Sequence, residues 1–302
     1  MPDFSPLPDT RRRTVAVGPL RITIDLHPRF EDAVDLLLAG FVGASDVPAR
    51  CDVHLTLDLG QLDRHEPQAA HFVREGSVLV GRCEAWHARL GASSDRVSAH
   101  FGIRDSRHLS PHLSEAWDHA VASAAVASAL RVTLAFAAPL VDGLLAHAAA
   151  AVSPAGNAWV FAGPSGEGKT TMTRRLANWR ALADDAVLVF ATAAGWRVTG
   201  TPLQGSERLP RRAESFPIAG LAFLEKAPIL DLARVSLAPA FAALLSRLIW
   251  FFAPDQRLAS RAHELVSSVP CWCLQSALSH DVAALLEARL PSVAASEAAH
   301  PW

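Results

Sequence analysis

The chain has 302 residues, which suffices for one large domain or two modest ones. Half of the residues are hydrophobic and 19% are charged, a balance that is typical of globular proteins and excludes a disordered chain. The net charge of −2 excludes a strong positive field, so we expect neither nucleic acid nor a membrane as a partner. Only Lys169 and Lys226 of the 28 basic residues are lysine, a scarcity that codon bias explains.

Cysteine usage and the N-terminal segment indicate a cytoplasmic protein. The four cysteines include no Cys-x-x-Cys pair, so we expect reduced, buried thiols and no structural metal cage. Residues 1–13 contain prolines and an arginine triplet where a secretory signal has an apolar core. The long uncharged stretch 143–165 is interrupted by Pro154 and Gly156, so we do not expect it to span a bilayer as one helix.

Residues 1–140 are predicted to form a smaller α+β region, which either extends the sheet of the second half or binds a substrate. Apolar and polar residues alternate on both sides of Gly18-Pro19, and this predicts two short strands joined by a turn. Helical spacing and strand-like runs then predict a helix over 29–42 and strands at 53–59, 78–86 and 96–103. A long alanine-rich helix over 114–136 follows, with Ser114 as its N-cap.

From residue 141 onward, strands and helices alternate around one glycine-rich loop. This alternation predicts an α/β domain over residues 141–302. One strand or a pair is expected at 144–152, followed by strands at 158–162, 186–190, 196–199, 221–224 and 269–274. Helices are expected at 170–179, 239–252 and 281–290.

Residues 163–170 match the phosphate-binding pattern G-x-x-x-x-G-K-[ST] at every fixed position. The glycines permit backbone angles that turn successive N–H groups into one concavity, and the following helix adds the positive end of its dipole. We expect Lys169 to hold the β- and γ-phosphates of ATP and the hydroxyl of Thr170 to bind Mg²⁺. The predicted nucleotide-binding residues are Gly163, Pro164, Ser165, Gly166, Glu167, Gly168, Lys169, Thr170 and Thr171.

An aspartate pair, Asp184-Asp185, follows only 15 positions after Lys169. One short helix and a short return segment connect the two sites, so both carboxylates are expected beside the phosphates. One carboxylate would then bind Mg²⁺ while the other takes the proton of an attacking hydroxyl. The alternative is a solvated pair of carboxylates at the start of a strand.

Three segments, in their order and spacing, resemble the catalytic domain of bacterial HPr serine kinase/phosphorylase, which shares its fold with ATP-dependent phosphoenolpyruvate carboxykinase. They are Leu145–Ala148, the phosphate loop, and Leu182–Val187. The resemblance is close over residues 141–200 and loose to about residue 290, and it implies a P-loop kinase domain with a mixed sheet.

The resemblance also implies a role for three side chains. Asp184 would be the general base that activates a substrate hydroxyl, and Asp185 would be a Mg²⁺ ligand. His147 would lie near the transferred phosphoryl group and tune the base. From the residues alone, His147 fits equally well as a filler of an alanine-rich strand pair.

The chain departs from this family in two places. The family's second signature is replaced by Thr199–Arg208, which leaves the acceptor and any phosphorylase activity open, and residues 1–140 do not resemble the family's N-terminal domain. The layout is closer to HPr-kinase-related proteins encoded beside peptide-modification genes, some of which resemble kinases of lasso-peptide precursors. Arg208, Arg211 and Arg212 are candidates for positive charge on the substrate side, with a solvated basic loop as the alternative.

The leading hypothesis is therefore an ATP-dependent kinase that transfers the γ-phosphoryl group to a hydroxyl, such as a serine of a small protein or peptide. One alternative is a carboxykinase-like or small-molecule kinase on the same fold. Another is a nucleotide-binding regulator without catalysis. The choice between ATP and GTP and the formation of a homo-oligomer stay open.

Overall fold

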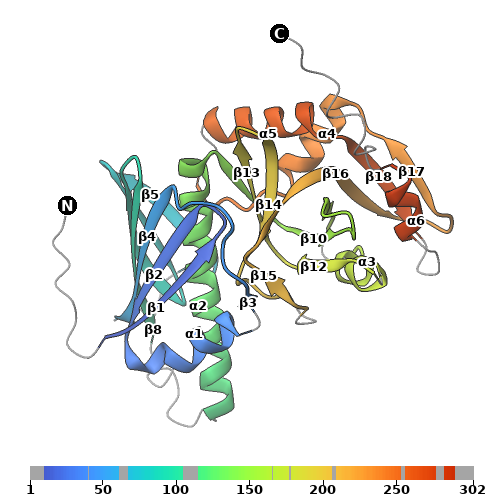
Figure 1. The fold of residues 1–302 in the computed structure, drawn as a ribbon. Coiled ribbons are helices and arrows are strands. Elements are labelled where there is room, and N and C mark those ends of the chain that lie inside the picture. Colours follow the sequence, from blue (N-terminus) through green and yellow to red (C-terminus); the bar gives the residue numbers. More distant parts are fainter. Residues whose placement is uncertain are drawn as a thin grey trace.

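The computed structural model describes most of the chain as a mixed α/β protein that is built mainly from strands (Figure 1). It describes residues 10–39, 41–60, 67–104, 115–164, 166–176, 178–205, 209–252, 256–276 and 282–289. Three residues named above, Ser114, Ser165 and Arg208, lie outside these ranges. Nearly all described strands belong to two large mixed sheets, the first formed before residue 105 and the second after residue 142.

The first sheet has parallel strands in its centre and antiparallel strands on both sides. Its order is β1-β2-β4-β8-β7-β6-β5, in which β2, β4 and β8 are parallel neighbours. The short helix α1 (Glu31–Leu38) follows the turn η1 (Pro28–Phe30). The strand bounds are β1 (Arg11–Val17), β2 (Leu20–Leu26), β4 (Cys51–Gly60), β5 (His71–Glu75), β6 (Val78–Cys83), β7 (Trp86–Ala92) and β8 (Arg96–Arg104).

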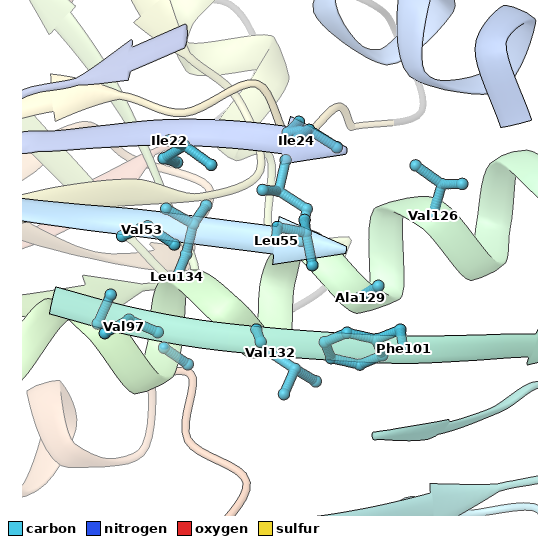
Figure 2. Close-up of a cluster of buried hydrophobic side chains, with 14 of the residues drawn as sticks. Ile22, Ile24, Val53, Leu55, Val97, Phe101, Val126, Ala129, Val132 and Leu134 are labelled. Atoms are coloured by element: carbon cyan, nitrogen blue, oxygen red, sulfur yellow. The ribbon is translucent and has the colours of Figure 1, made fainter. Parts of the chain in front are cut away.

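Helix α2 (Glu115–Ala137) covers the apolar face of the first sheet. Alternate residues of its central strands, such as Leu55 and Phe101, point to this face because successive side chains of a strand lie on opposite sides. Figure 2 shows them with Val126 and Ala129 of α2 in one cluster. After α2, the turn η3 (Ala138–Val141) leads into the second sheet.

One described segment, His119–Val141, is long and apolar enough to cross a membrane. However, 61% of its most apolar window is buried inside the protein, where α2 packs on the first sheet. A buried core helix has the same composition as a membrane span, so the structure is compatible with a soluble protein. Residues 143–165, the long uncharged stretch considered above as a possible membrane span, form strands and a loop in the structure.

The second sheet has nine described strands. Its path is β12-β10-β11-β16-β14-β13-β9, and β18 pairs with both β16 and β17. The bounds are β9 (Gly143–Ala146), β10 (Ala148–Val152), β11 (Ala158–Ala162), β12 (Arg180–Ala183), β13 (Val187–Thr192), β14 (Gly195–Gly200), β16 (Ser215–Lys226), β17 (Asp231–Arg234) and β18 (Cys271–Ser276). The strand β11 is parallel to β16, and β16 is parallel to β18, so the carboxyl ends of these three strands meet at one edge.

Helices cover both faces of the second sheet around β10 and β11. On one face, α4 (Leu237–Leu245) and α5 (Gln256–Ser268) pack against Ala150 and Val160. On the other face, α3 (Lys169–Arg175) and α6 (Val282–Glu287) pack against Phe161. Every residue of β10 and β11 is buried, which is why these strands are continuous apolar runs without alternation.

The two sheets share one core and several polar links. Leu188 and Phe190 of β13 belong to the same buried cluster as α2 and the first sheet. The short strand β3 (Phe41–Val42) pairs in parallel with β15 (Arg211–Arg212). Arg50 Nη2 lies 2.6 Å from Asp142 Oδ2, and the same guanidinium donates to the carbonyl oxygen of Val141. In Figure 1, α2 lies between the two sheets.

The structure confirms most predicted elements and corrects some. The predicted strand 78–86 is in fact β6 and the start of β7, separated by a turn, and the predicted helix 29–42 ends at Leu38. The stretch 144–152 is a pair of strands with His147 between them. The predicted helix 239–252 ends at Leu245. Helix α5 and strands β3, β5, β12, β15 and β17 were not predicted from the sequence.

Candidate phosphate-binding site

The phosphate loop lies where the sequence places it, between the buried strand β11 and helix α3. Gly166 and Gly168 have φ angles of 82° and 94°, a region that residues with a side chain rarely adopt. A Cβ atom at either position would meet no atom within 4 Å, so the space on that side of the loop is open. The glycines therefore provide both the backbone shape and the room that an anion needs.

Lys169 is buried inside this loop, with 7% of its surface exposed. Its ammonium donates to the carbonyl oxygen of Gly163 at 2.8 Å and to that of Pro164 at 3.0 Å. Burial lowers the pKa of Lys169, and the positive charge of Arg247 lowers it further, while Asp185 and Glu167 raise it. Among the described residues no carboxylate forms a salt bridge with this ammonium. A bound phosphate would supply the missing negative charge.

Asp185 lies between β12 and β13, and two basic side chains hold its carboxylate. Arg131 Nη2 lies 2.6 Å from Oδ2, and His147 Nδ1 lies 3.4 Å from Oδ1. The Asp185 side chain is 15% exposed. The negative charge of Asp185 acts to raise the pKa of both His147 and Lys169.

Asp184 is more deeply buried than its neighbour, with 2% of its surface exposed. One carboxylate oxygen, Oδ1, accepts a hydrogen bond from the backbone N–H of Gly205 at 3.3 Å. The other oxygen, Oδ2, is buried and has no hydrogen-bond partner among the described residues. Burial raises the pKa of Asp184, and the negative charge of Asp185 adds to the increase. A carboxylate of this kind is an available proton acceptor.

His147 lies between β9 and β10 and is fixed by the backbone on two sides. Its backbone N–H donates to the carbonyl oxygen of Arg247 at 2.7 Å, and the ring nitrogen Nδ1 lies 2.9 Å from the carbonyl oxygen of Asp185. Since a carbonyl only accepts, this contact puts a proton on Nδ1. Burial lowers the pKa of His147, and the charge of Lys169 lowers it further. The side chain thus contacts Asp185 both at its carbonyl oxygen and at its carboxylate.

Two pockets border the phosphate loop at the carboxyl ends of β11, β16 and β18. The first, of about 490 Å³, is lined by Gly166, Gly168, Thr171, Met172, Arg175, Leu224, Glu225, Lys226, Ala227, Pro228 and Leu274 together with Glu167. The second, of about 380 Å³, includes Gly163, Pro164, Lys226 and Arg247. Ligands of open α/β sheets commonly bind at this edge.

The structure brings together most predicted site residues and shows others that the sequence analysis missed. The phosphate loop, His147 and Asp185 form one site. The Asp184 carboxylate is buried next to it and accepts a hydrogen bond from the backbone N–H of Gly205. Two further basic residues, Lys226 and Arg247, line the pockets beside the loop, and Arg131 forms an ion pair with Asp185. Arg131 carried a signal in the sequence, because it is the single charged side chain between residues 120 and 141.

Both alternatives given for Arg211, a charge on the substrate side and a solvated basic loop, were wrong. Arg211 is 2% exposed, and its guanidinium donates to the carbonyl oxygens of Leu37, Ala39 and Pro202. It therefore binds the end of α1 and fixes β15 against β3. Arg212 is half-buried, and its Nη1 lies 4.0 Å from Glu214 Oε1.

Within the described ranges, no group of three or more His, Cys, Asp or Glu side chains is placed to hold a metal ion. This finding concerns only sites with three or more such ligands. It leaves open a Mg²⁺ ion of the kind that accompanies nucleotides, because such an ion takes one or two protein ligands and completes its shell with phosphate oxygens and water.

The comparison with protein families finds one match. Residues 112–250 match the family described as SynChlorMet cassette protein ScmC. The matched stretch begins before α2 and extends beyond α4, so it contains Arg131, His147, the phosphate loop and the aspartate pair together. No curated protein matches the chain.

Proposed function

We propose that the protein is an ATP-dependent kinase of the P-loop type, which transfers the γ-phosphoryl group to a hydroxyl of a small protein or peptide. The main observation behind this proposal concerns Lys169. Its ammonium is buried in a glycine-rich loop beside Asp185 and forms no salt bridge with a described carboxylate. The match to a phosphate-loop pattern and the two bordering pockets support the same function.

The residues present fit Mg²⁺-bound ATP. The open space over Gly166 and Gly168 would receive phosphate oxygens, and Lys169 would exchange a loop carbonyl for the β- and γ-phosphates. The Thr170 hydroxyl and the Asp185 carboxylate would hold Mg²⁺, which neutralises charge on the phosphates when bound. The pocket beside Thr171 and Lys226 would take the nucleoside.

Asp184 is proposed as the base that accepts the proton of the acceptor hydroxyl. In the transfer step the hydroxyl oxygen forms a bond to the γ-phosphorus, the bond from that phosphorus to the bridging oxygen of ADP breaks, and Oδ2 of Asp184 takes the proton. The absence of a described partner at Oδ2 and the raised pKa of Asp184 support this role. His147 would stabilise the orientation of Asp185 through its contact at Nδ1.

The acceptor is proposed as a peptide or small protein, and the protein is proposed to work in the cytoplasm. The matched family is described as a cassette protein, so peptides encoded in the same gene cassette are the first acceptors to test. No reaction is named in that description.

A regulator that binds a nucleotide without transferring phosphate is the second candidate. The observation that favours it is the 2% exposure of Asp184, since a general base has to reach its substrate and Gly205 lies against this carboxylate. A regulator would bind ATP with the same loop but would leave the acceptor unchanged.

The test is transfer of a labelled γ-phosphate to candidate peptides, measured together with ATP binding. A kinase labels a peptide, and Lys169→Ala weakens ATP binding and reduces the labelling. A regulator binds ATP and labels no peptide. Absence of ATP binding by the wild-type protein would reject both functions.

A further inference from the structure

Arg131 is a single charge in an otherwise apolar helix. Between residues 120 and 141 of α2 and η3, no other residue is charged, and the helix packs on the first sheet through buried apolar side chains. The guanidinium leaves this surface and reaches the second sheet, where Nη2 lies 2.6 Å from Asp185 Oδ2. A charge in such a helix is costly unless it has a specific task.

The guanidinium has binding capacity that Asp185 does not use. Its Nε–H is buried and has no hydrogen-bond partner among the described residues, while the side chain as a whole is 36% exposed. An arginine presents several N–H donors in a planar fork that suits the paired oxygens of a phosphate. Arg131 can therefore exchange the carboxylate for a phosphate with a gain in hydrogen bonds.

The Asp185 carboxylate cannot bind both Arg131 and Mg²⁺ fully at the same time. Arg131 occupies its Oδ2, and His147 stands at Oδ1. A magnesium ion that binds this carboxylate would have to displace Arg131 or share Oδ2 with it, at a cost from the repulsion between two positive charges. The γ-phosphate of ATP would offer the displaced guanidinium a new anion within the same site.

We infer that Arg131 is a γ-phosphate sensor, which pairs with Asp185 in the nucleotide-free protein and moves to the terminal phosphate when Mg²⁺-bound ATP enters. This inference rests on the proposed function. It makes Arg131 a specificity-determining residue for triphosphate over diphosphate. It also links nucleotide binding to α2 and through it to the first sheet.

The experiment measures the affinity of the full chain for ADP and for a non-hydrolysable ATP analogue at several Mg²⁺ concentrations. The wild-type protein should prefer the triphosphate, and Arg131→Gln should reduce this preference by about tenfold, as expected for a charged hydrogen bond. The same variant should bind ADP at a lower Mg²⁺ concentration, because Arg131 no longer competes for Asp185. Arg131→Lys should keep part of the preference.

Arg50→Gln is the matched control, since Arg50 Nη2 lies 2.6 Å from Asp142 Oδ2 at another junction of the two sheets. It should leave both affinities and the Mg²⁺ dependence unchanged. If Arg131→Gln, folded with the melting temperature of the control, retains the wild-type preference and Mg²⁺ dependence, the inference is overturned while the proposed function stands. If Arg131→Gln does not fold, the same comparison is made with Arg131→Lys: retention of the full wild-type preference and Mg²⁺ dependence overturns the inference. A wild-type protein that binds neither nucleotide overturns both.

Discussion

Gly205 lies directly against the carboxylate of Asp184: a Cβ atom on Gly205 would be 2.6 Å from Oδ2 and would have to displace it. The backbone N–H of the same glycine donates to Oδ1. Gly205 therefore covers the carboxylate of Asp184, the first aspartate of the pair. In the proposed reaction, the acceptor hydroxyl would have to reach Asp184 beside Gly205.

Substitution of Asp184 by Asn should separate nucleotide binding from phosphoryl transfer. The variant keeps the shape of the side chain and its acceptor for Gly205 but cannot take a proton, so ATP should still bind while transfer to a peptide is lost. The melting temperature should rise, because the substitution removes a buried charge that has an unpartnered oxygen. A transfer rate equal to that of the wild-type protein would exclude Asp184 as the base.

Lys226 should contribute to nucleotide binding, although much less than Lys169. It is exposed at the end of β16 and lines both pockets beside the phosphate loop. An exposed charge is screened by solvent, and Lys226→Ala should therefore weaken ATP binding by about fivefold at most. Lys169→Ala should weaken it by about tenfold to a hundredfold. Titrations at low and high salt should reveal the stronger screening at Lys226; equal losses would contradict this ranking.

Arg211 should matter for stability, whereas its neighbour Arg212 should not. Arg211→Ala leaves three buried carbonyl groups without their charged donor, so we expect a loss of about 3 kcal/mol or more in the free energy of unfolding. Arg212→Gln removes a half-buried contact of 4.0 Å and should cost at most about 0.5 kcal/mol. Denaturant titration measures both values. Similar midpoints for the two variants would refute the structural role of Arg211.

The sequence predicted the parts of the site that depend on local order. The phosphate loop requires a strand, a run of glycines and a helix in succession, and Gly166 and Gly168 adopt the backbone angles that such a loop needs. The strands and helices around it followed from apolar runs and periodicity. The structure also places His147 Nδ1 2.9 Å from the carbonyl oxygen of Asp185, and the role of this contact stays a prediction.

The rest depends on contacts between residues far apart in the chain. Arg131 reaches Asp185 only because α2 lies between the two sheets, and nothing in the sequence near Asp185 indicates this. Arg211 was expected in a basic loop, but the pairing of β15 with β3 buries it against the end of α1. Lys226 joins the site because β16 runs parallel to β11.

The cysteine thiols should be unreactive in the folded protein. Burial raises the pKa of Cys51 and Cys271 to about 11, against about 8.5 for a free cysteine, so at pH 8 the reactive thiolate is scarce. Modification by a thiol reagent should be slow and should accelerate on unfolding. The unfolded chain loses the thiol protons at a lower pH than the folded protein does, so the free energy of unfolding should fall as the pH rises above about 8.5. Rapid labelling of Cys51 or Cys271 at pH 8 would contradict this prediction; replacement of each cysteine by serine identifies the reacting thiol.

Gly168 and Gly156 offer a matched pair for testing the phosphate loop itself. Both have positive φ angles, 94° and 83°, and a Cβ atom would meet no neighbour within 4 Å at either position. Substitution by alanine should therefore destabilise both to a similar extent, by about 1–2 kcal/mol, the usual cost of this conformation for a residue with a side chain. Gly156 lies in the turn between β10 and β11, so Gly156→Ala should bind ATP normally. At Gly168, the added methyl group would occupy the space proposed for phosphate, and ATP binding should fall well beyond the effect of the lost stability. If the two variants bind ATP equally well, the open space over Gly168 is not the phosphate site.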